Sequence, residues 1–411
     1  MSNKGMIINE CAQLNVARRV LEGRVDSATF FRKIHGDLLI TGNEAGNQEM
    51  LLDLFQCGME KSDMPTILLT SHLELMTKIQ KKRDLKEMSC VMTSCPTDKN
   101  YHPFYGMIAQ QILRFVRMTA EEMGYGILTD QVMIYAAAVL NVVASKYPVS
   151  LPAVAKLLKE DDDFISEFAL QSGLSNVIAD NIRANHEAGI VLRLEEIFEH
   201  IYMPGCDTKY NFQSGAKGNV TGMAMYVCAG NQCIFNSYLK EEFFCTLKRV
   251  PRVRVILDEM PFTDENDELL KYLMETKRQN KIELILISQN INEMMHGREG
   301  LDFSNIVMFI HGTPAATDDI SGALFGSYQH YFPVPVAGNT PHVIFSIKHS
   351  VQWQIQSEER FRIRSQDLYA KKTILGHSSD YLAVKTTANA NVYLIHVSDF
   401  LPALTGVPLV V

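Results

Sequence analysis

The pattern that most constrains the fold is an apolar strand that ends in two acids and is followed by a helix and a second apolar strand. Residues 253–259 read VRVILDE, and residues 283–289 read ELILISQ. The stretch between them begins acidic and ends in Lys277 and Arg278, as the dipole of a helix favours. Short apolar runs that alternate with helical stretches predict parallel strands covered by helices on both faces.

The same alternation recurs along much of the chain. The further runs that we interpret as strands are residues 37–41, 66–70, 89–94, 222–228 and 306–310. After the first of them, Met50, Leu51, Leu54 and Phe55 fall on one face of a helix. The fold class predicted from these patterns is α/β with a mostly parallel central sheet.

The stretch between residues 106 and 203 interrupts this pattern and reads as helices only. The predicted helices are residues 106–124, 129–146, 152–159, 164–171 and 176–203. Residues 342–398 instead alternate apolar with polar side chains, which is typical of strands. We therefore predict three segments: residues 1–105 as the first part of the α/β domain, 106–203 as an inserted all-α domain, and 204–411 as its second part with a strand-rich end.

Composition and charge exclude several classes of protein. The net charge of −8 gives no electrostatic reason to expect a polyanion over the whole surface. The eight cysteines contain no CxxC pair, so we expect reduced, mostly buried thiols in an intracellular compartment. Residues 1–30 lack the pattern of a secretory signal, and the longest apolar stretch, residues 132–144, is too short to span a bilayer. A cytoplasmic protein without a direct membrane span is expected.

The acids after the strand at 253–257 suit the chemistry of ATP hydrolysis. Asp258 would orient the water ligands of Mg²⁺, and Glu259 would polarise the attacking water. Gln289, at the end of the second strand, would sense the γ-phosphate or orient water, although an ordinary strand-end amide is the alternative. Arg278 is placed either to reach across a subunit boundary or simply to cap its helix.

These residues resemble the Walker B segment and the following glutamine motif of type IV coupling proteins, the TraG/TraD family of hexameric ATPases related to FtsK and HerA. Residues 100–104 are similar to the family's Asn-Pro segment, with His102 where Asn is usual. The resemblance covers residues 36 to 400. It implies a RecA-like P-loop domain, an all-α domain, a ring assembly, and passage of DNA or protein into a type IV secretion channel.

The phosphate-binding loop departs from the family pattern. A working loop reads GxxxxGK[ST], in which Lys contacts the phosphates and the hydroxyl binds Mg²⁺. The equivalent residues here are Gly42, Asn43, Glu44, Ala45, Gly46, Asn47, Gln48 and Glu49. The second Gly, the Lys and the hydroxyl are therefore all replaced. A carboxylate about 5 Å from a phosphate charge costs on the order of 3 kcal/mol at an effective dielectric of about 20, so tight ATP binding is not expected.

Two other basic features have ordinary alternatives. Where coupling proteins commonly carry an acid and a lysine, this chain has Thr70-Ser71-His72, and His72 reads more readily as a structural histidine than as a catalyst. The run of Lys and Arg between residues 78 and 86 is either a solvated helix face or a contact for DNA.

Three functions remain open at the level of sequence. The first is a coupling-protein-like pseudo-ATPase: a structural or substrate-recruiting subunit in conjugation or type IV secretion that binds no cofactor tightly. The second is an active hexameric motor that uses Mg-ATP through a non-standard loop. The third is an unrelated α/β protein. The first two imply a homo- or hetero-oligomeric ring, with an active ATPase paralogue, secretion-channel or relaxosome components and DNA as partners, at the inner face of the membrane through those partners.

Overall fold

The structure is a computed structural model of the 411-residue chain. It describes residues 3–16, 21–23, 27–42, 48–60, 64–86, 90–95, 104, 107–146, 149, 151–201, 222–227, 232–248, 250–260, 268–289, 303–309, 324–337, 351–363, 381–386 and 389–400. Within these ranges no helix has the length and apolar character needed to cross a bilayer.

The chain forms two compact units, which we call the terminal unit and the central unit. The terminal unit combines Met1–Met50 with Ile287–Val411, and the central unit is Leu51–Leu286. The sequence likewise assigned both ends of the chain to one α/β domain, whereas the two compact units here divide between residues 50 and 51 and between 286 and 287. The predicted domain bounds stay a prediction. The predicted all-α segment lies wholly within the central unit, and its status as a separate domain stays a prediction.

The central unit contains a sheet with the strand order β7-β6-β3-β5-β4. The bounds of these strands are β3 Thr66–Thr70, β4 Val91–Cys95, β5 Gly222–Val227, β6 Val253–Asp258 and β7 Ile282–Ser288. The pairs β3/β6, β3/β5 and β4/β5 are parallel. The N–H of Val253 donates to the carbonyl of Lys281, so β6 and β7 also begin side by side. The predicted α/β fold with a mostly parallel sheet is confirmed.

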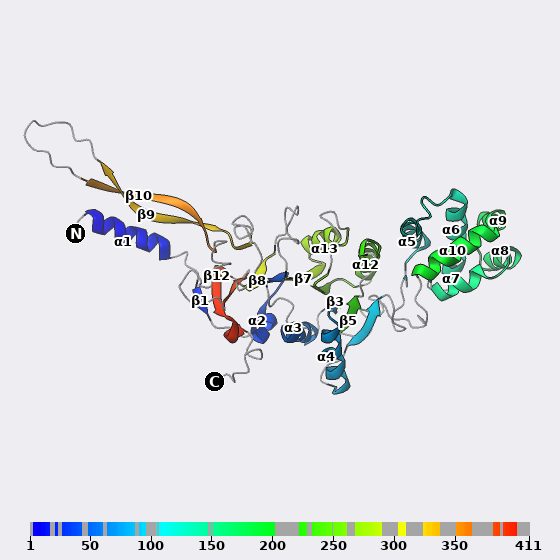
Figure 1. Ribbon diagram of the computed structural model, residues 1–411, viewed down its shortest axis with the longest axis horizontal. Coiled ribbons are helices and arrows are strands. Elements are labelled where there is room, and N and C mark those ends of the chain that lie inside the picture. The colour runs from blue at the N-terminus through cyan, green and yellow to red at the C-terminus, as the bar shows by residue number, and fades with distance from the viewer. Residues whose placement is uncertain are drawn as a thin grey trace, which may run out of the picture. The chain divides into compact units, whose positions relative to one another are not determined.

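Helices cover both faces of this sheet (Figure 1). They are α3 Gln48–Glu60, α4 Leu73–Asp84, α12 Gln232–Leu247 and α13 Glu268–Arg278. In α4 the side chains of Leu75, Met76 and Ile79 are buried, as their spacing along one helical face requires, whereas Leu73 is exposed. Every residue of β3 and β6 is buried. Strands covered on both faces read as continuous apolar runs, which is why the sequence located them.

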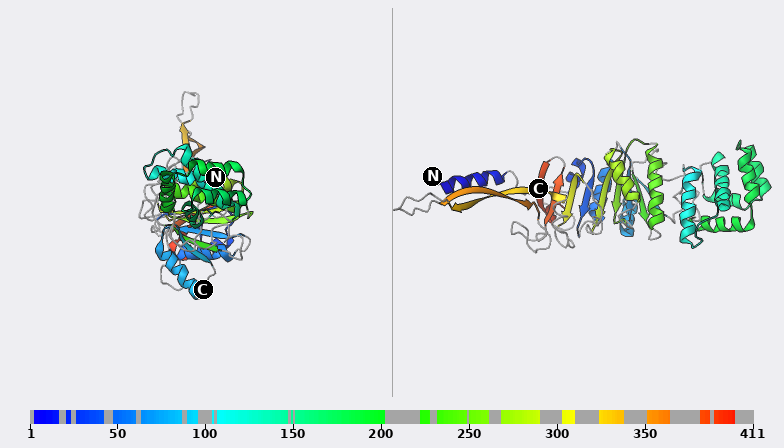
Figure 2. Two further views of the ribbon diagram at one scale, coloured as in Figure 1. Left: turned by 90° about the vertical axis from the view of Figure 1, so that its right-hand side faces the viewer. Right: turned by 90° about the horizontal axis from the view of Figure 1, so that it is seen from above.

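The segment predicted to be all-α contains only helices in its described residues, and Figure 2 shows them gathered together. They are α5 Ala109–Glu122, α6 Asp130–Lys146, α7 Leu151–Leu158, α8 Asp162–Gln171, α9 Asn176–Asn185 and α10 Ala188–Ile201. The single helix expected over residues 176–203 is wrong, because the backbone leaves helical geometry at His186. There the ring Nδ1 lies 2.7 Å from the hydroxyl of the buried Tyr135, which holds this corner on α6.

The terminal unit has a mixed sheet in the order β1-β12-β11-β8-β2. Its strands are β1 Leu21–Gly23, β2 Leu38–Thr41, β8 Asn305–Phe309, β11 Tyr381–Thr386 and β12 Asn389–His396, and its sheet-side helices are α2 Ser27–Lys33 and α17 Val397–Phe400. Parallel pairs join β2 to β8 and β1 to β12, whereas β11 is antiparallel to both of its neighbours. Within the segment predicted to be strand-rich, the described residues include the strands β11 and β12.

A two-stranded antiparallel ribbon completes the terminal unit (Figure 1). Strand β9, Ser327–Ala337, pairs along its whole length with β10, Val351–Phe361. Helix α1, Asn3–Val16, packs beside both strands, and the ammonium group of Lys4 lies 4.7 Å from the centre of the Trp353 ring. The alternation of Val351, Trp353 and Ile355 predicted β10, but its long partner strand was not predicted.

Candidate functional site

The acid predicted to act at a metal site lies at the carboxyl end of β6 and is fully buried. Asp258 has an exposed fraction of 0%, and the five residues before it in β6 are buried as well. Its register partner on the neighbouring strand β3 is Thr70, the last residue of that strand. Carboxyl ends of parallel strands are the usual place for ligand sites in α/β sheets, and Asp258 lies at such an end; its role at a metal site stays a prediction.

Asp258 is held by two side chains from the end of β3. The hydroxyl of Thr70 donates to Oδ2 of Asp258 at 2.6 Å, and Nδ1 of His72 lies 2.8 Å from the same oxygen. The backbone N–H of His72 also donates to the Thr70 hydroxyl at 3.0 Å. The hydrogen bond to Asp258, together with nearby carboxylates, raises the pKa of His72 above its usual value, although partial burial opposes this. The expectation of a structural rather than catalytic histidine stays a prediction, but His72 touches the predicted metal ligand.

The two oxygens of Asp258 are in different situations. Oδ1 is buried and has no hydrogen-bond partner among the described residues, whereas Oδ2 takes both donors. An orphaned carboxylate oxygen suits one contact to water or to a hydrated cation. The described ranges contain no group of three or more His, Cys, Asp or Glu side chains placed to hold a metal ion. This arrangement does not fit a resident Mg²⁺ as it stands.

Glu259 follows Asp258 in a strained backbone conformation. Its φ is +50°, in the left-handed region that non-glycine residues rarely occupy, and its side chain is half-buried. Strain of this kind persists only where the surroundings fix it, and it is frequent at functional sites. The two acids therefore differ in exposure: Asp258 is fully buried, whereas Glu259 is only half-buried.

The predicted phosphate loop has the expected strand–loop–helix context. Strand β2 ends at Thr41, and α3 begins at Gln48, with Glu49 in its first turn. Residues 43–47 lie outside the described part of the chain. Gly42 has a φ of +105°, and a Cβ there would lie 2.5 Å from the carbonyl oxygen of Phe309. Close packing alone therefore requires a glycine, so its presence does not indicate nucleotide binding.

The remaining predicted site residues lie at strand and helix ends. Gln289 directly follows β7 and is exposed, at the end of a strand that neighbours β6. Arg278 is the last residue of α13 and is exposed, four residues before β7 begins at Ile282. Because β6 and β7 start together, Arg278 lies near the opposite end of β6 from Asp258. It cannot act on Asp258 of its own chain, and a role across a subunit boundary stays a prediction.

A buried ion pair that the sequence reasoning missed joins β6 to β7. Nε of Arg254 donates to Oε2 of Glu283 at 2.8 Å, a second guanidinium nitrogen contacts the same oxygen, and a third donates to the carbonyl of Gly58 at 3.0 Å. Both side chains are about 5% exposed or less. Arg254 and Glu283 are each the second residue of their strand, and this matched position was the available signal.

A second polar cluster joins α5 to α12 and α13. Glu268 accepts hydrogen bonds from Arg114 on α5 and from Lys240 on α12, the latter at 3.0 Å. Burial acts to raise the pKa of Glu268, but these two cations outweigh it and hold the pKa below its usual range. Beside the cluster, the rings of Phe104, Phe115 and Tyr238 pack against one another. Of the motif at residues 100–104, only Phe104 lies within the described residues.

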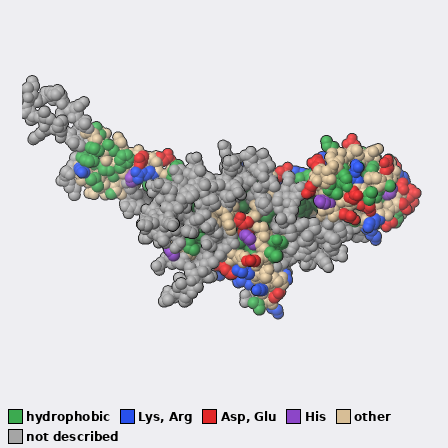
Figure 3. Space-filling model, viewed as in Figure 1, with side chains coloured by type: hydrophobic (Ala, Val, Ile, Leu, Met, Phe, Trp, Pro, Cys, Tyr) green, Lys and Arg blue, Asp and Glu red, His purple; other side chains and the backbone are tan. Residues whose placement is uncertain are grey.

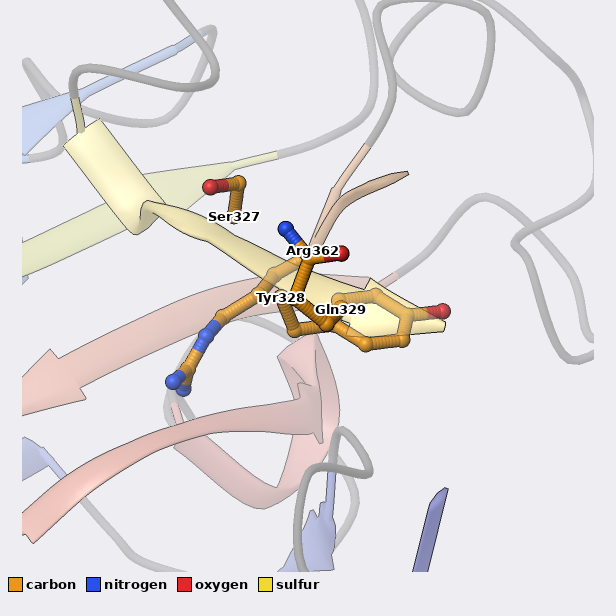
Figure 4. Close-up of a pocket in the computed structure, with 4 residues that line it drawn as sticks. All are labelled: Ser327, Tyr328, Gln329 and Arg362. Carbon is orange, nitrogen blue, oxygen red and sulfur yellow. The ribbon is translucent and has the colours of Figure 1, made fainter. Parts of the chain in front are cut away.

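Two further surface features involve none of the predicted catalytic residues. A cavity of about 330 Å³ at the base of the ribbon is lined by Ser327, Tyr328, Gln329 and Arg362 (Figure 4). Lys and Arg side chains gather over α4 (Figure 3), where the predicted basic run lies on the last two turns of the helix. The side chains of Cys11, Cys57 and Cys245 are buried and are not in disulfides, and burial raises the pKa of Cys90 to about 11, which keeps that group protonated.

Comparisons with known proteins give structural likenesses only. No protein-family model matches the chain, and no curated protein matches it. The bacterial conjugative coupling protein TrwBdeltaN70, in an unbound form, is similar with a TM-score of 0.49 and 14% identity over 94% of this chain and 90% of that chain. The plasmid coupling protein TrwB in complex with ADP and Mg²⁺ gives 0.47 and 12% over 94% and 91%. VirB4 of Thermoanaerobacter pseudethanolicus gives 0.41 and 13% over 72% and 85%.

The first two of these structures are of the kind of protein that the motifs resemble. TM-scores below 0.5 at such low identity carry no argument about function, so the α/β fold rests on the sheet described above. The chemistry rests on the residues around Asp258 and at the start of α3.

Proposed function

We propose that this chain is a coupling-protein-like pseudo-ATPase, a structural or substrate-recruiting subunit in the transfer of DNA or protein. The observation that carries the proposal is the start of α3, where Gln48 and Glu49 occupy the first turn and no basic residue is present in it. In a working P-loop these two positions supply the Lys that reaches the phosphates and the hydroxyl that binds Mg²⁺.

The charges at the start of α3 oppose a triphosphate. A helix N-terminus attracts anions through its free N–H groups, but this contribution is only about 0.3–1 kcal/mol at an exposed site. A carboxylate such as Glu49 about 5 Å from a phosphate charge costs on the order of 3 kcal/mol per charge pair at an effective dielectric of about 20. The repulsion is larger than the attraction, and the favourable Lys contact is absent as well. Net binding of Mg-ATP should be weaker by several orders of magnitude than in a working loop.

The presence of Asp258 and Gly42 fits this proposal because both residues stabilise the fold. Asp258 joins β6 to β3 by its contacts with Thr70 and His72, so its loss would leave two buried or partly buried donors without their acceptor. Gly42 is likewise required by its contact with Phe309. Selection for the fold alone would therefore keep both residues after ATP turnover had ceased.

The partners in this proposal follow from the family resemblance. The chain would join a ring of identical or related subunits, with an active ATPase paralogue supplying the energy. Secretion-channel or relaxosome components and DNA are the further partners, and they would hold the chain at the inner face of the membrane. Mass photometry of the chain alone and mixed with an active coupling-protein ATPase tests this part, because a ring requires a mixed or homo-oligomeric species.

Calorimetric titration with Mg-ATP tests the loss of nucleotide binding. We expect no binding by the natural chain at millimolar ATP. The triple variant Asn47→Gly, Gln48→Lys and Glu49→Thr should recover measurable binding. A matched control, Gln48→Met with Glu49→Ala, removes the acid without supplying the cation and should recover little.

The alternative is an active motor with a non-standard loop, favoured by the presence of Asp258, Glu259 and Gln289 together. It makes the opposite prediction for the same titration. Micromolar binding by the natural chain, with ATP trapped by Glu259→Gln, would establish the motor and overturn the pseudo-ATPase.

A further inference from the structure

The contacts of Asp258 raise the question of what balances its charge. A buried carboxylate without a counter-charge or donors is unfavourable by several kcal/mol. In a working P-loop ATPase a hydrated Mg²⁺ and its ligands satisfy the acid at this position. Here the acid is 0% exposed, and both of its recorded donors, Thr70 and His72, come from the end of one strand, β3.

These two donors form one connected unit. The N–H of His72 donates to the Thr70 hydroxyl at 3.0 Å, and that hydroxyl in turn donates a hydrogen bond to Oδ2 of Asp258 at 2.6 Å. The ring of His72 then closes on the same oxygen at 2.8 Å. Three consecutive hydrogen bonds therefore fix the imidazole over the carboxylate. The strand register that places Thr70 opposite Asp258 builds this geometry into the sheet.

We propose that His72 is a positioning residue that satisfies Asp258 in place of a hydrated divalent cation, and so closes the acid pair to such cations when no nucleotide is present. The inference deepens the proposed function and rests on it in one respect, the assignment of Asp258 to an ancestral metal position. With His72 and Thr70 on Oδ2, only the buried Oδ1 remains to meet an ion. Mg²⁺ retains several waters and needs an open approach, which this carboxylate does not give.

Removal of the ring should open the site. About a third of the His72 side chain is exposed, so a small replacement leaves a solvent-connected gap rather than a closed cavity. Water and ions can then reach Oδ2 of Asp258, with Glu259 as a second acid beside it. The natural chain should therefore be indifferent to divalent cations, and a chain without His72 should bind them.

The test uses the full chain without nucleotide and Mn²⁺ as the probe. Binding is measured by the loss of the free Mn²⁺ signal in electron paramagnetic resonance, and thermal unfolding is followed in parallel. We expect His72→Ala to bind Mn²⁺ at least tenfold more tightly than the natural chain. Its melting temperature should be lower without Mn²⁺ and should recover in part when Mn²⁺ is added, because a ligand of the folded state alone stabilises it.

Matched variants separate positioning from general destabilisation. His186→Ala removes a comparable partly buried histidine contact, that with Tyr135, and should lower the melting temperature with no change in Mn²⁺ binding. His72→Ala combined with Asp258→Asn should lose the gained affinity. His72→Ser is a second small replacement that also removes the ring, and it serves if the alanine variant does not fold.

Unchanged Mn²⁺ affinity in a folded His72→Ala or His72→Ser variant would refute the inference. Micromolar Mn²⁺ binding by the natural chain would refute it as well. Neither result bears on the proposed function, because these measurements contain no nucleotide, whereas the pseudo-ATPase fails only in the titration with Mg-ATP.

Discussion

The ion pair between Arg254 and Glu283 allows a quantitative test of the sheet that carries Asp258. In Glu283→Ala the guanidinium keeps its contact with the carbonyl of Gly58 but loses both bonds to the carboxylate, which is its ion-pair partner. Both groups are at most about 5% exposed, so water cannot replace the lost acceptor. Breaking a buried pair of this kind destabilises a protein by about 3–5 kcal/mol.

A double replacement shows whether the pair itself stabilises the fold. Arg254→Met with Glu283→Leu removes both charges and keeps the volume, and such replacements are often neutral or stabilising. We expect this variant to lie within about 1 kcal/mol of the natural chain. Removing both charges should therefore lower the free energy of unfolding much less than removing the carboxylate alone, so the two positions are strongly coupled.

The assay has to report on the central unit. The only tryptophan of the chain, Trp353, lies in the terminal unit, so its fluorescence reports the unfolding of that unit and not of the central unit. Hydrogen exchange of the β6 and β7 amides under increasing urea measures the free energy of opening locally. A loss below about 1 kcal/mol in Glu283→Ala would show that the pair is solvated or absent. A double variant as unstable as the single one would show that apolar side chains cannot replace the pair, and either result would refute the reasoning.

Three further outcomes are expected. Gly42→Ala should destabilise the terminal unit by roughly 1–3 kcal/mol, because the added Cβ meets the Phe309 carbonyl and φ is positive; unchanged urea unfolding followed by tryptophan fluorescence would contradict this. The pKa of Glu268 is lowered in the folded chain, so its contribution to stability is present above its unfolded pKa and is lost as pH falls through the folded value. Arg114→Ala should therefore destabilise α5 at pH 7 and have less effect below about pH 4. Hydrogen exchange of the α5 amides measures this difference. Asp161→Ala removes the acceptor of the Phe164 N–H at the start of α8 and should lower the free energy of unfolding by about 1 kcal/mol, measured by circular dichroism; an equal melting temperature would contradict it.

The strands of the central sheet were predictable because they are covered on both faces. A run such as residues 253–257 is apolar except for Arg254, so its type and its end at Asp258 follow from the sequence alone. What the sequence lacks is the pairing of strands. Thr70 and Asp258 are 188 residues apart, and only the parallel register of β3 with β6 brings the hydroxyl and His72 onto the carboxylate.

The helical segment shows the opposite difficulty. The apolar periodicity of residues 176–203 continues through His186, so a single helix was the natural prediction. The break coincides with a contact to Tyr135, a residue on another helix, and the nearest glycine, Gly189, lies three residues further on, inside α10. The ribbon strand β9 escaped prediction for a similar reason, since its two prolines argue against a strand although both are accommodated in a two-stranded ribbon.

The way the terminal unit is assembled has a consequence for synthesis. Strand β1, close to the start of the chain, pairs with β12, which the ribosome completes almost last. The central unit is one continuous stretch and has all of its strands once residue 288 has left the exit tunnel. Domains fold as units while the chain emerges, so the central unit should reach its native state on the ribosome. The strands β1 and β2 cannot pair until β12 and β8 have been synthesised. We therefore expect the first fifty residues to be the segment that binds a chaperone during translation.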